Sequence, residues 1–277
     1  MPGLMALARP GNCVMSAVGV AVGGVVAAGP AAWGAYAVPL LYAAVAAGLS
    51  TAGGNALNDL FDRETDRVNH PERPLVSGAV TAAEARRFVG GAFVAAAALG
   101  LMASPLCLVV VLVNAGLMYV YESGLKRQGA PGNVVIAYLV GSLFLFAGFA
   151  VFRSDPRPLV ATGILALLAL LTTVGREITK DIEDMAGDVD RRTLPQRIGA
   201  ARAGRVASAA LVAGVALSAV PWFAGVLSWA YAGVVVPADG MFIYAAFYSA
   251  ADPTRSQRVT KYAMVVALLA FLAGALL

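Results

Sequence analysis

Asn55-Ala-Leu-Asn58-Asp59-Leu-Phe-Asp62-Arg-Glu-Thr-Asp66 follows a long apolar run in this chain, and its acidic pattern recurs at Glu177-Ile-Thr-Lys180-Asp181-Ile-Glu-Asp184-Met-Ala-Gly-Asp188. We name these the first and second acidic stretches. Their aspartates share the spacing i, i+3 and i+7, and the second set follows the first by 122 positions (181−59). At about 100° per residue, this spacing places three carboxylates within roughly 60° of one helix face. The two stretches therefore predict two acidic helix ends in an otherwise apolar chain.

The rest of the sequence is typical of an integral membrane protein. Hydrophobic residues make up 60% of the 277 positions and charged residues only 13%, and a helix needs about 20 apolar residues to cross a bilayer. We predict an all-α, polytopic protein in which residues 1–277 form one integral-membrane domain. Its nine predicted spans, of which Pro237 and Asp239 interrupt the eighth, lie near 12–29, 34–54, 83–102, 104–122, 133–152, 158–176, 203–221, 225–249 and 259–277.

The basic residues indicate how these helices are oriented. With the N-terminus inside, all of the 20 Lys and Arg residues fall on the inner side except Arg153 and Arg157. This bias follows the positive-inside rule and itself favours an odd number of spans. We therefore expect a multi-pass protein of the cell membrane with its N-terminus and both acidic loops in the cytoplasm. The net charge of +4 reflects this topology, so we expect no nucleic-acid partner.

The aspartates of the two stretches are candidate metal ligands. A charge is costly to bury near a membrane, so ionisable residues there are functional candidates. One acidic stripe also fits a solvated helix end, whereas two with the same spacing on one side favour a shared site. Mg²⁺ prefers carboxylate oxygens and is usually bound together with substrate phosphates. The ligands predicted on this basis are Asp59, Asp62, Asp66, Asp181, Asp184 and Asp188.

Several cations near these carboxylates fit a diphosphate. Arginine offers a planar fork to phosphate oxygens and lysine a mobile point charge. We predict diphosphate contacts for Arg67, Arg73, Lys126 and Lys180. Metal ions and cations in this arrangement stabilise the negative charge that develops when a diphosphate leaves an allylic carbon.

The acidic stretches resemble the motifs of a known family, the UbiA superfamily of intramembrane prenyltransferases. Asn58, Asp62 and Asp66 match its first motif, NxxxDxxxD, and Asp184 and Asp188 match its second, DxxxD. The resemblance covers essentially the whole chain, because that family has nine helices and two cytoplasmic Asp-rich loops. It implies nine helices around a central cavity, Mg²⁺ as cofactor and Asn58 as a further metal ligand. It also implies that the four motif aspartates are catalytic.

Four local strings are similar to the branch of this superfamily that makes archaeal-type ether lipids: Arg9-Pro-Gly-Asn12-Cys13, Asn69-His-Pro-Glu-Arg-Pro74, the run from Leu125-Lys-Arg127 to Gly132-Asn-Val134, and Gly175-to-Asp184. This resemblance implies transfer of a geranylgeranyl group from its diphosphate to the hydroxyl of geranylgeranylglyceryl phosphate, which forms an ether. The partners would be a prenyl diphosphate donor, a lipid alcohol phosphate acceptor and membrane lipids. Arg9 and Asn12 match positions near the family's acceptor pocket, so we expect them to meet the acceptor head group.

Three other functions were weighed. A UbiA-type enzyme with an aromatic acceptor (a quinone, haem or chlorophyll precursor) would share every metal ligand. A CDP-alcohol phosphotransferase requires Asp-Gly-x-x-Ala-Arg, which occurs nowhere in the sequence. A secondary transporter usually binds its substrate near the bilayer midplane, whereas these acids lie at helix ends and only Asp239 lies inside a predicted span.

Overall fold

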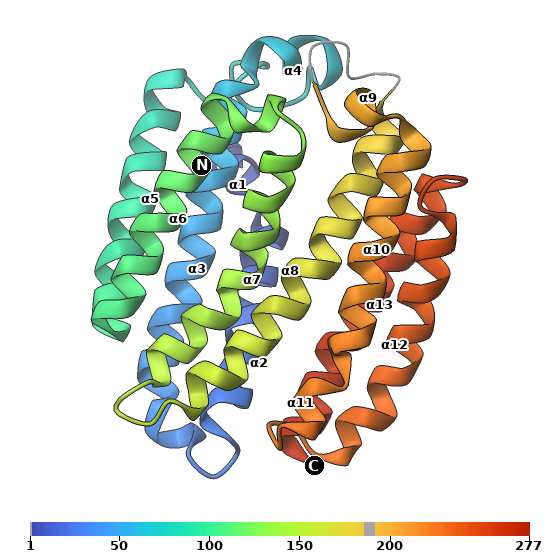
Figure 1. The fold of residues 1–277 in the computed structure, drawn as a ribbon. Coiled ribbons are helices and arrows are strands. Elements are labelled where there is room, and N and C mark those ends of the chain that lie inside the picture. Colours follow the sequence, from blue (N-terminus) through green and yellow to red (C-terminus); the bar gives the residue numbers. More distant parts are fainter. Residues whose placement is uncertain (1, 186–191) are drawn as a thin grey trace.

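The structure, a computed structural model, describes residues 2–185 and 192–277. Every regular element in that part of the chain is a helix, as predicted, and Figure 1 shows the long helices standing side by side in one bundle. The elements are α1 (Pro2–Ala8), α2 (Pro10–Ala28), α3 (Trp33–Phe61), α4 (Arg63–Asn69), α5 (Ala82–Ala103), α6 (Pro105–Ser123), the 3₁₀ turn η1 (Leu125–Arg127), α7 (Ala130–Val151), α8 (Arg157–Asp184), α9 (Leu194–Ile198), α10 (Ala200–Ser218), α11 (Val220–Phe223), α12 (Trp229–Tyr248) and α13 (Pro253–Leu276).

Nine helices in the described ranges are long and apolar enough to cross a membrane, in agreement with the nine predicted spans. The seventh span, Ala200–Phe223, combines α10 and α11. The N-terminal helix α1, α4 and α9 lie at one end of the bundle and the C-terminus at the other (Figure 1). This placement fits an odd number of crossings.

The second and sixth spans extend beyond the apolar segments, and this extension builds the site. Helix α3 has 29 residues and continues to Phe61, while α8 has 28 and continues to Asp184. Both helices therefore carry acidic residues one or two turns past their apolar parts. The first stretch is not one continuous helix, because α3 ends at Phe61, Asp62 caps it, and α4 begins at Arg63. Asp66 consequently lies on a separate short helix.

Close packing between helices holds α8 in the bundle. A methyl group added at Gly141 of α7 would lie 2.7 Å from the carbonyl oxygen of Ala166 in α8. One added at Gly175 of α8 would lie 2.7 Å from Cγ of Leu211 in α10. Small residues at such contacts let helix backbones approach closely in lipid. Helix α8 is thus held between α7 and α10.

Helix α12 is unbroken, contrary to the predicted interruption at Pro237. A proline inside a membrane helix removes one backbone hydrogen bond, which neighbouring groups can compensate. Asp239 lies two residues further on, and its Oδ2 accepts a hydrogen bond of 2.7 Å from Ser218 Oγ of α10.

Candidate active site

A cavity of about 850 Å³ opens where the two acidic helix ends meet. Its wall combines residues of α3, α4, α6, η1 and α8 with the loop after α4. We name it the polar cavity. Its charged lining residues are Arg9, Asp62, Asp66, Arg73, Glu122, Lys126, Glu177, Lys180, Glu183 and Asp184, with His70 beside them.

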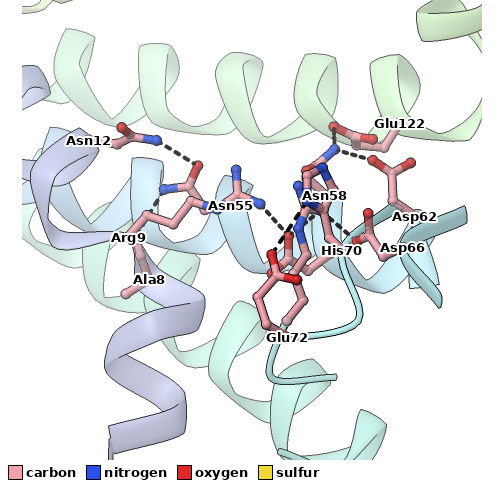
Figure 2. Close-up of polar contacts among 12 residues, drawn as sticks. Ala8, Arg9, Asn12, Asn55, Asn58, Asp62, Asp66, His70, Glu72 and Glu122 are labelled. Carbon is pink, nitrogen blue, oxygen red and sulfur yellow. Dashed lines mark hydrogen bonds and ion pairs between the residues drawn. The ribbon is translucent and has the colours of Figure 1, made fainter. Parts of the chain in front are cut away.

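Four side chains of this wall form a closed ring of polar contacts. Asn58 Nδ2 donates to Asp62 Oδ2 and to Glu122 Oε1, each at 3.0 Å. Lys126 Nζ lies 2.5 Å from Asp62 Oδ2 and 3.1 Å from Glu122 Oε2. Figure 2 shows Asn58 between the carboxylates of Asp62 and Glu122. The ring joins α3 to α6 and η1 at the mouth of the cavity.

A second group of contacts holds the remaining aspartates of the first stretch. Asp59, which is only 2% exposed, accepts from Arg9 Nη2 and from Arg73 Nη1, the latter at 3.2 Å. Arg73 Nη1 also lies 2.5 Å from Asp66 Oδ2. The Asn69–Pro74 loop thereby folds back over the acidic helix end. Two guanidinium groups balance two buried carboxylates, as burial of charge requires.

The second stretch approaches the same cavity from α8. Lys180 and Asp184 line its wall, whereas Asp181 Oδ2 accepts a hydrogen bond of 2.8 Å from Asn133 Nδ2 of α7. The first aspartate of each stretch, Asp59 or Asp181, therefore makes a contact between elements, while the next aspartate, Asp62 or Asp184, lines the cavity. The predicted ligand Asp188 lies outside the described residues.

A smaller cavity of about 330 Å³ continues into the bundle. The two cavities share lining residues, among them Thr51, Asn55 and Met118. Its walls come from α2, α3, α6 and α7, and most of the lining area is contributed by aliphatic side chains and Phe146. An extended apolar chain could thus continue from the polar cavity into the membrane interior.

The polar cavity brings most of the predicted site residues together. Asn58, Asp62, Asp66, Asp184, Arg73, Lys126, Lys180 and Arg9 all line it. Asn12 lines the deeper cavity instead, where its Nδ2 lies 3.4 Å from Asn55 Oδ1. Arg67 is not among the lining residues; it is exposed and pairs with Glu64 at 2.6 Å. Asp59 and Asp181 lie behind the wall in the contacts described above.

In the part of the chain that the structure describes, no three His, Cys, Asp or Glu side chains are grouped closely enough to hold a metal ion. Two of the acids are paired with cations instead: Lys126 contacts Asp62, and Arg73 contacts Asp66. The donors nevertheless suit Mg²⁺, because hard carboxylate and amide oxygens from three helices line one cavity. A metal that binds Asp62 Oδ2 or Asp66 Oδ2 would displace the cation that now contacts that oxygen.

Glu122 is the site residue that motif matching missed. Its side chain is 7% exposed, it contacts two predicted site residues and it lines the cavity. A signal was present in the sequence, since Glu122 and Lys126 stand four residues apart with the glutamate first, the order that favours pairing on a helix.

Comparison with known proteins assigns the family. Residues 15–274 match the model of the UbiA prenyltransferase family. The chain is a member of the UbiA prenyltransferase family. A digeranylgeranylglyceryl phosphate synthase of Methanopyrus kandleri is 40% identical over 281 residues, which cover 100% of both chains.

Solved structures of UbiA-family members share this fold. One of digeranylgeranylglyceryl phosphate synthase superposes with a TM-score of 0.84 at 31% identity, over 99% of this chain and 98% of the other. A UbiA homologue from Archaeoglobus fulgidus, bound to GPP and Mg²⁺, gives a TM-score of 0.66 at 17% identity and covers 98% of each chain. The nine-helix UbiA fold predicted from the sequence is thus confirmed.

Proposed function

We propose that this enzyme is a Mg²⁺-dependent prenyltransferase that moves a geranylgeranyl group from its diphosphate to the hydroxyl of geranylgeranylglyceryl phosphate. One observation carries the proposal: a single cavity lined by Asp62, Asp66 and Asp184 together with Lys126 and Lys180 joins a deeper, largely aliphatic cavity. A prenyl diphosphate has the same two parts, an anionic head and an apolar tail. The similarity to named digeranylgeranylglyceryl phosphate synthases over the full length supports this choice of substrates.

The proposed metal ligands are the oxygens of both acidic stretches. They comprise Asn58, Asp62, Asp66, Asp184 and Asp188, with Asp59 and Asp181 as supporting acids. Bound Mg²⁺ would neutralise charge on the leaving diphosphate. Arg73, Lys126 and Lys180 are proposed to hold the diphosphate oxygens, since all three line the cavity. Arg67 is the predicted diphosphate contact that the structure supports least, because it is exposed and pairs with Glu64.

For the acceptor we propose Arg9 and Asn12 at the start of α2, of which Arg9 lines the polar cavity and Asn12 the smaller one. Arg9 is 34% exposed in its side chain and faces the polar cavity, so its guanidinium could meet a phosphate. Asn12 lies deeper and faces Asn55, where an amide could meet the glycerol hydroxyl. The acceptor phosphate would then remain near the membrane surface while its hydroxyl reaches the smaller cavity.

Replacing Arg9 by alanine should raise the acceptor's KM by about tenfold or more, because a hydrogen bond between charged groups contributes roughly 1.5–3 kcal/mol. The donor's KM should change much less. Steady-state kinetics with each substrate varied in turn would measure both values. Arg9→Lys keeps the charge and should recover part of the affinity, while Arg157→Ala at the opposite end is a control for charge removal. A change confined to the donor's KM would contradict the role given to Arg9.

We also propose that the N-terminus and both acidic helix ends face the cytoplasm of a multi-pass membrane protein. In the predicted topology, all of the 20 Lys and Arg residues except Arg153 and Arg157 fall on the side that carries the N-terminus. The positive-inside rule places that side in the cytoplasm. A single cysteine at Ser77, in the loop after α4, and another at Gln196 of α9 should both react with an impermeant maleimide only from the cytoplasmic side. Reaction from opposite sides would be incompatible with one site built from both stretches.

A further inference from the structure

The structure assigns Glu122 a role for which neither the acidic motifs nor the proposed mechanism accounts. We propose that Glu122 is a positioning residue: it holds the Lys126 ammonium and the Asn58 carboxamide so that Asp62 remains available to Mg²⁺. The proposal rests on the proposed function, because it concerns the same metal site.

The ring of contacts shows why a second carboxylate matters. Lys126 Nζ lies 2.5 Å from Asp62 Oδ2 and 3.1 Å from Glu122 Oε2, and the lysine side chain is only 12% exposed. A metal that binds Asp62 Oδ2 must displace this ammonium. A buried cation without a counter-charge is strongly disfavoured. With Glu122 in place, Lys126 keeps one carboxylate partner when it leaves Asp62.

The same carboxylate fixes the orientation of Asn58. Glu122 Oε1 and Asp62 Oδ2 both accept from the amide nitrogen of Asn58, each at 3.0 Å. The amide oxygen is therefore the atom that Asn58 can offer to a cation. Groups that hold metal ligands in this way commonly raise metal affinity. Glu122 thus acts on two residues of the first motif from a neighbouring helix.

The proposal predicts opposite effects for the two ends of the Glu122–Lys126 pair. Without Glu122, Lys126 depends on Asp62 alone and competes with the metal, so Glu122→Gln should weaken metal binding roughly tenfold, within the range known for residues that support metal ligands. Lys126→Met removes the competitor and should tighten binding. In the Lys126→Met background, Glu122→Gln should then have a much smaller effect of about twofold, since coupled residues are not additive.

Mn²⁺ binding to the purified protein in detergent, measured by EPR without any substrate, tests this double-mutant cycle. Glu177→Gln is the matched control, because it removes one carboxylate from the wall of the same cavity but pairs with Arg176 outside the ring. It should weaken Mn²⁺ binding by less than Glu122→Gln. If the Glu122→Gln protein does not fold, Glu122→Asp can replace it. Aspartate is one methylene shorter, so its carboxylate lies further from Lys126 and Asn58, and Mn²⁺ affinity should fall roughly threefold.

An equal loss of Mn²⁺ affinity with and without Lys126 would overturn the proposal, because Glu122 would then not act by holding Lys126 away from Asp62. Unchanged affinity in Glu122→Gln, or a loss no larger than in Glu177→Gln, would overturn it as well, while the proposed prenyltransferase activity would stand. If the unmodified protein bound no Mn²⁺, the magnesium site itself and this role for Glu122 would both be wrong.

Discussion

Asp62→Ala should lower kcat/KM for prenyl transfer roughly a thousandfold, which corresponds to about 4 kcal/mol of lost transition-state stabilisation. Asp62 is the acid at the junction of α3 and α4, and it faces Asn58, Lys126 and the polar cavity. Its loss would remove a proposed metal oxygen and leave the leaving diphosphate less neutralised. The rate of product formation with geranylgeranyl diphosphate and varied Mg²⁺ measures the effect.

Glu64→Ala is the matched control for this substitution. Glu64 belongs to the same acidic stretch, but its side chain is 75% exposed. Among the described residues, its one ion pair is with Arg67. We expect its rate to stay within about twofold of the unmodified enzyme, as for most surface changes. The Asp62→Ala protein should still fold, because Lys126 retains Glu122 as a partner. Near-normal turnover in Asp62→Ala would remove the basis for a metal site at the first stretch.

The fold could be predicted from the sequence because membrane helices depend on length and apolarity more than on detailed packing. Each predicted span corresponds to a helix of sufficient length and hydropathy in the structure. The helix ends were less predictable, because α3 and α8 continue into polar residues. A rule that counts the apolar residues needed to cross a bilayer stops before them. The break at Asp62 was also missed, because the spacing i, i+3, i+7 was interpreted on one ideal helix.

The site was predicted in outline for a similar reason. Motif spacing identified acids near one another in the chain, and the structure places Asp62, Asp66 and Asp184 on one cavity. Spacing does not reveal which neighbour a side chain meets, so the inward contacts of Asp59 with Arg9 and of Asp181 with Asn133 were not anticipated. Glu122 was missed because its spacing to Lys126 indicates only a helical ion pair, whereas its contact with Asn58 joins α6 to α3, which spacing does not show.

The preference between a phosphorylated lipid and an aromatic acceptor should be nearly absolute. A phosphate monoester carries about two negative charges at neutral pH, and the polar cavity offers it Arg9, apart from the cations proposed for the diphosphate. An aromatic acid carries less charge and also needs a flat slot between apolar or aromatic side chains. Among the described residues that line the polar cavity, only Tyr121 and His70 have aromatic rings, and His70 is exposed. The cavity therefore matches the charged acceptor better.

The most direct test gives purified enzyme Mg²⁺, labelled geranylgeranyl diphosphate and one acceptor at a time: geranylgeranylglyceryl phosphate, 4-hydroxybenzoate or dihydroxynaphthoate. Mass spectrometry then identifies the prenylated product, with a parallel reaction in EDTA. We expect an ether-linked digeranylgeranyl product from the glycerophosphate lipid, none in EDTA until Mg²⁺ is restored, and at most about 1% of that rate with either aromatic acid, a discrimination of roughly 3 kcal/mol. Efficient prenylation of 4-hydroxybenzoate with no product from geranylgeranylglyceryl phosphate would contradict the proposed acceptor.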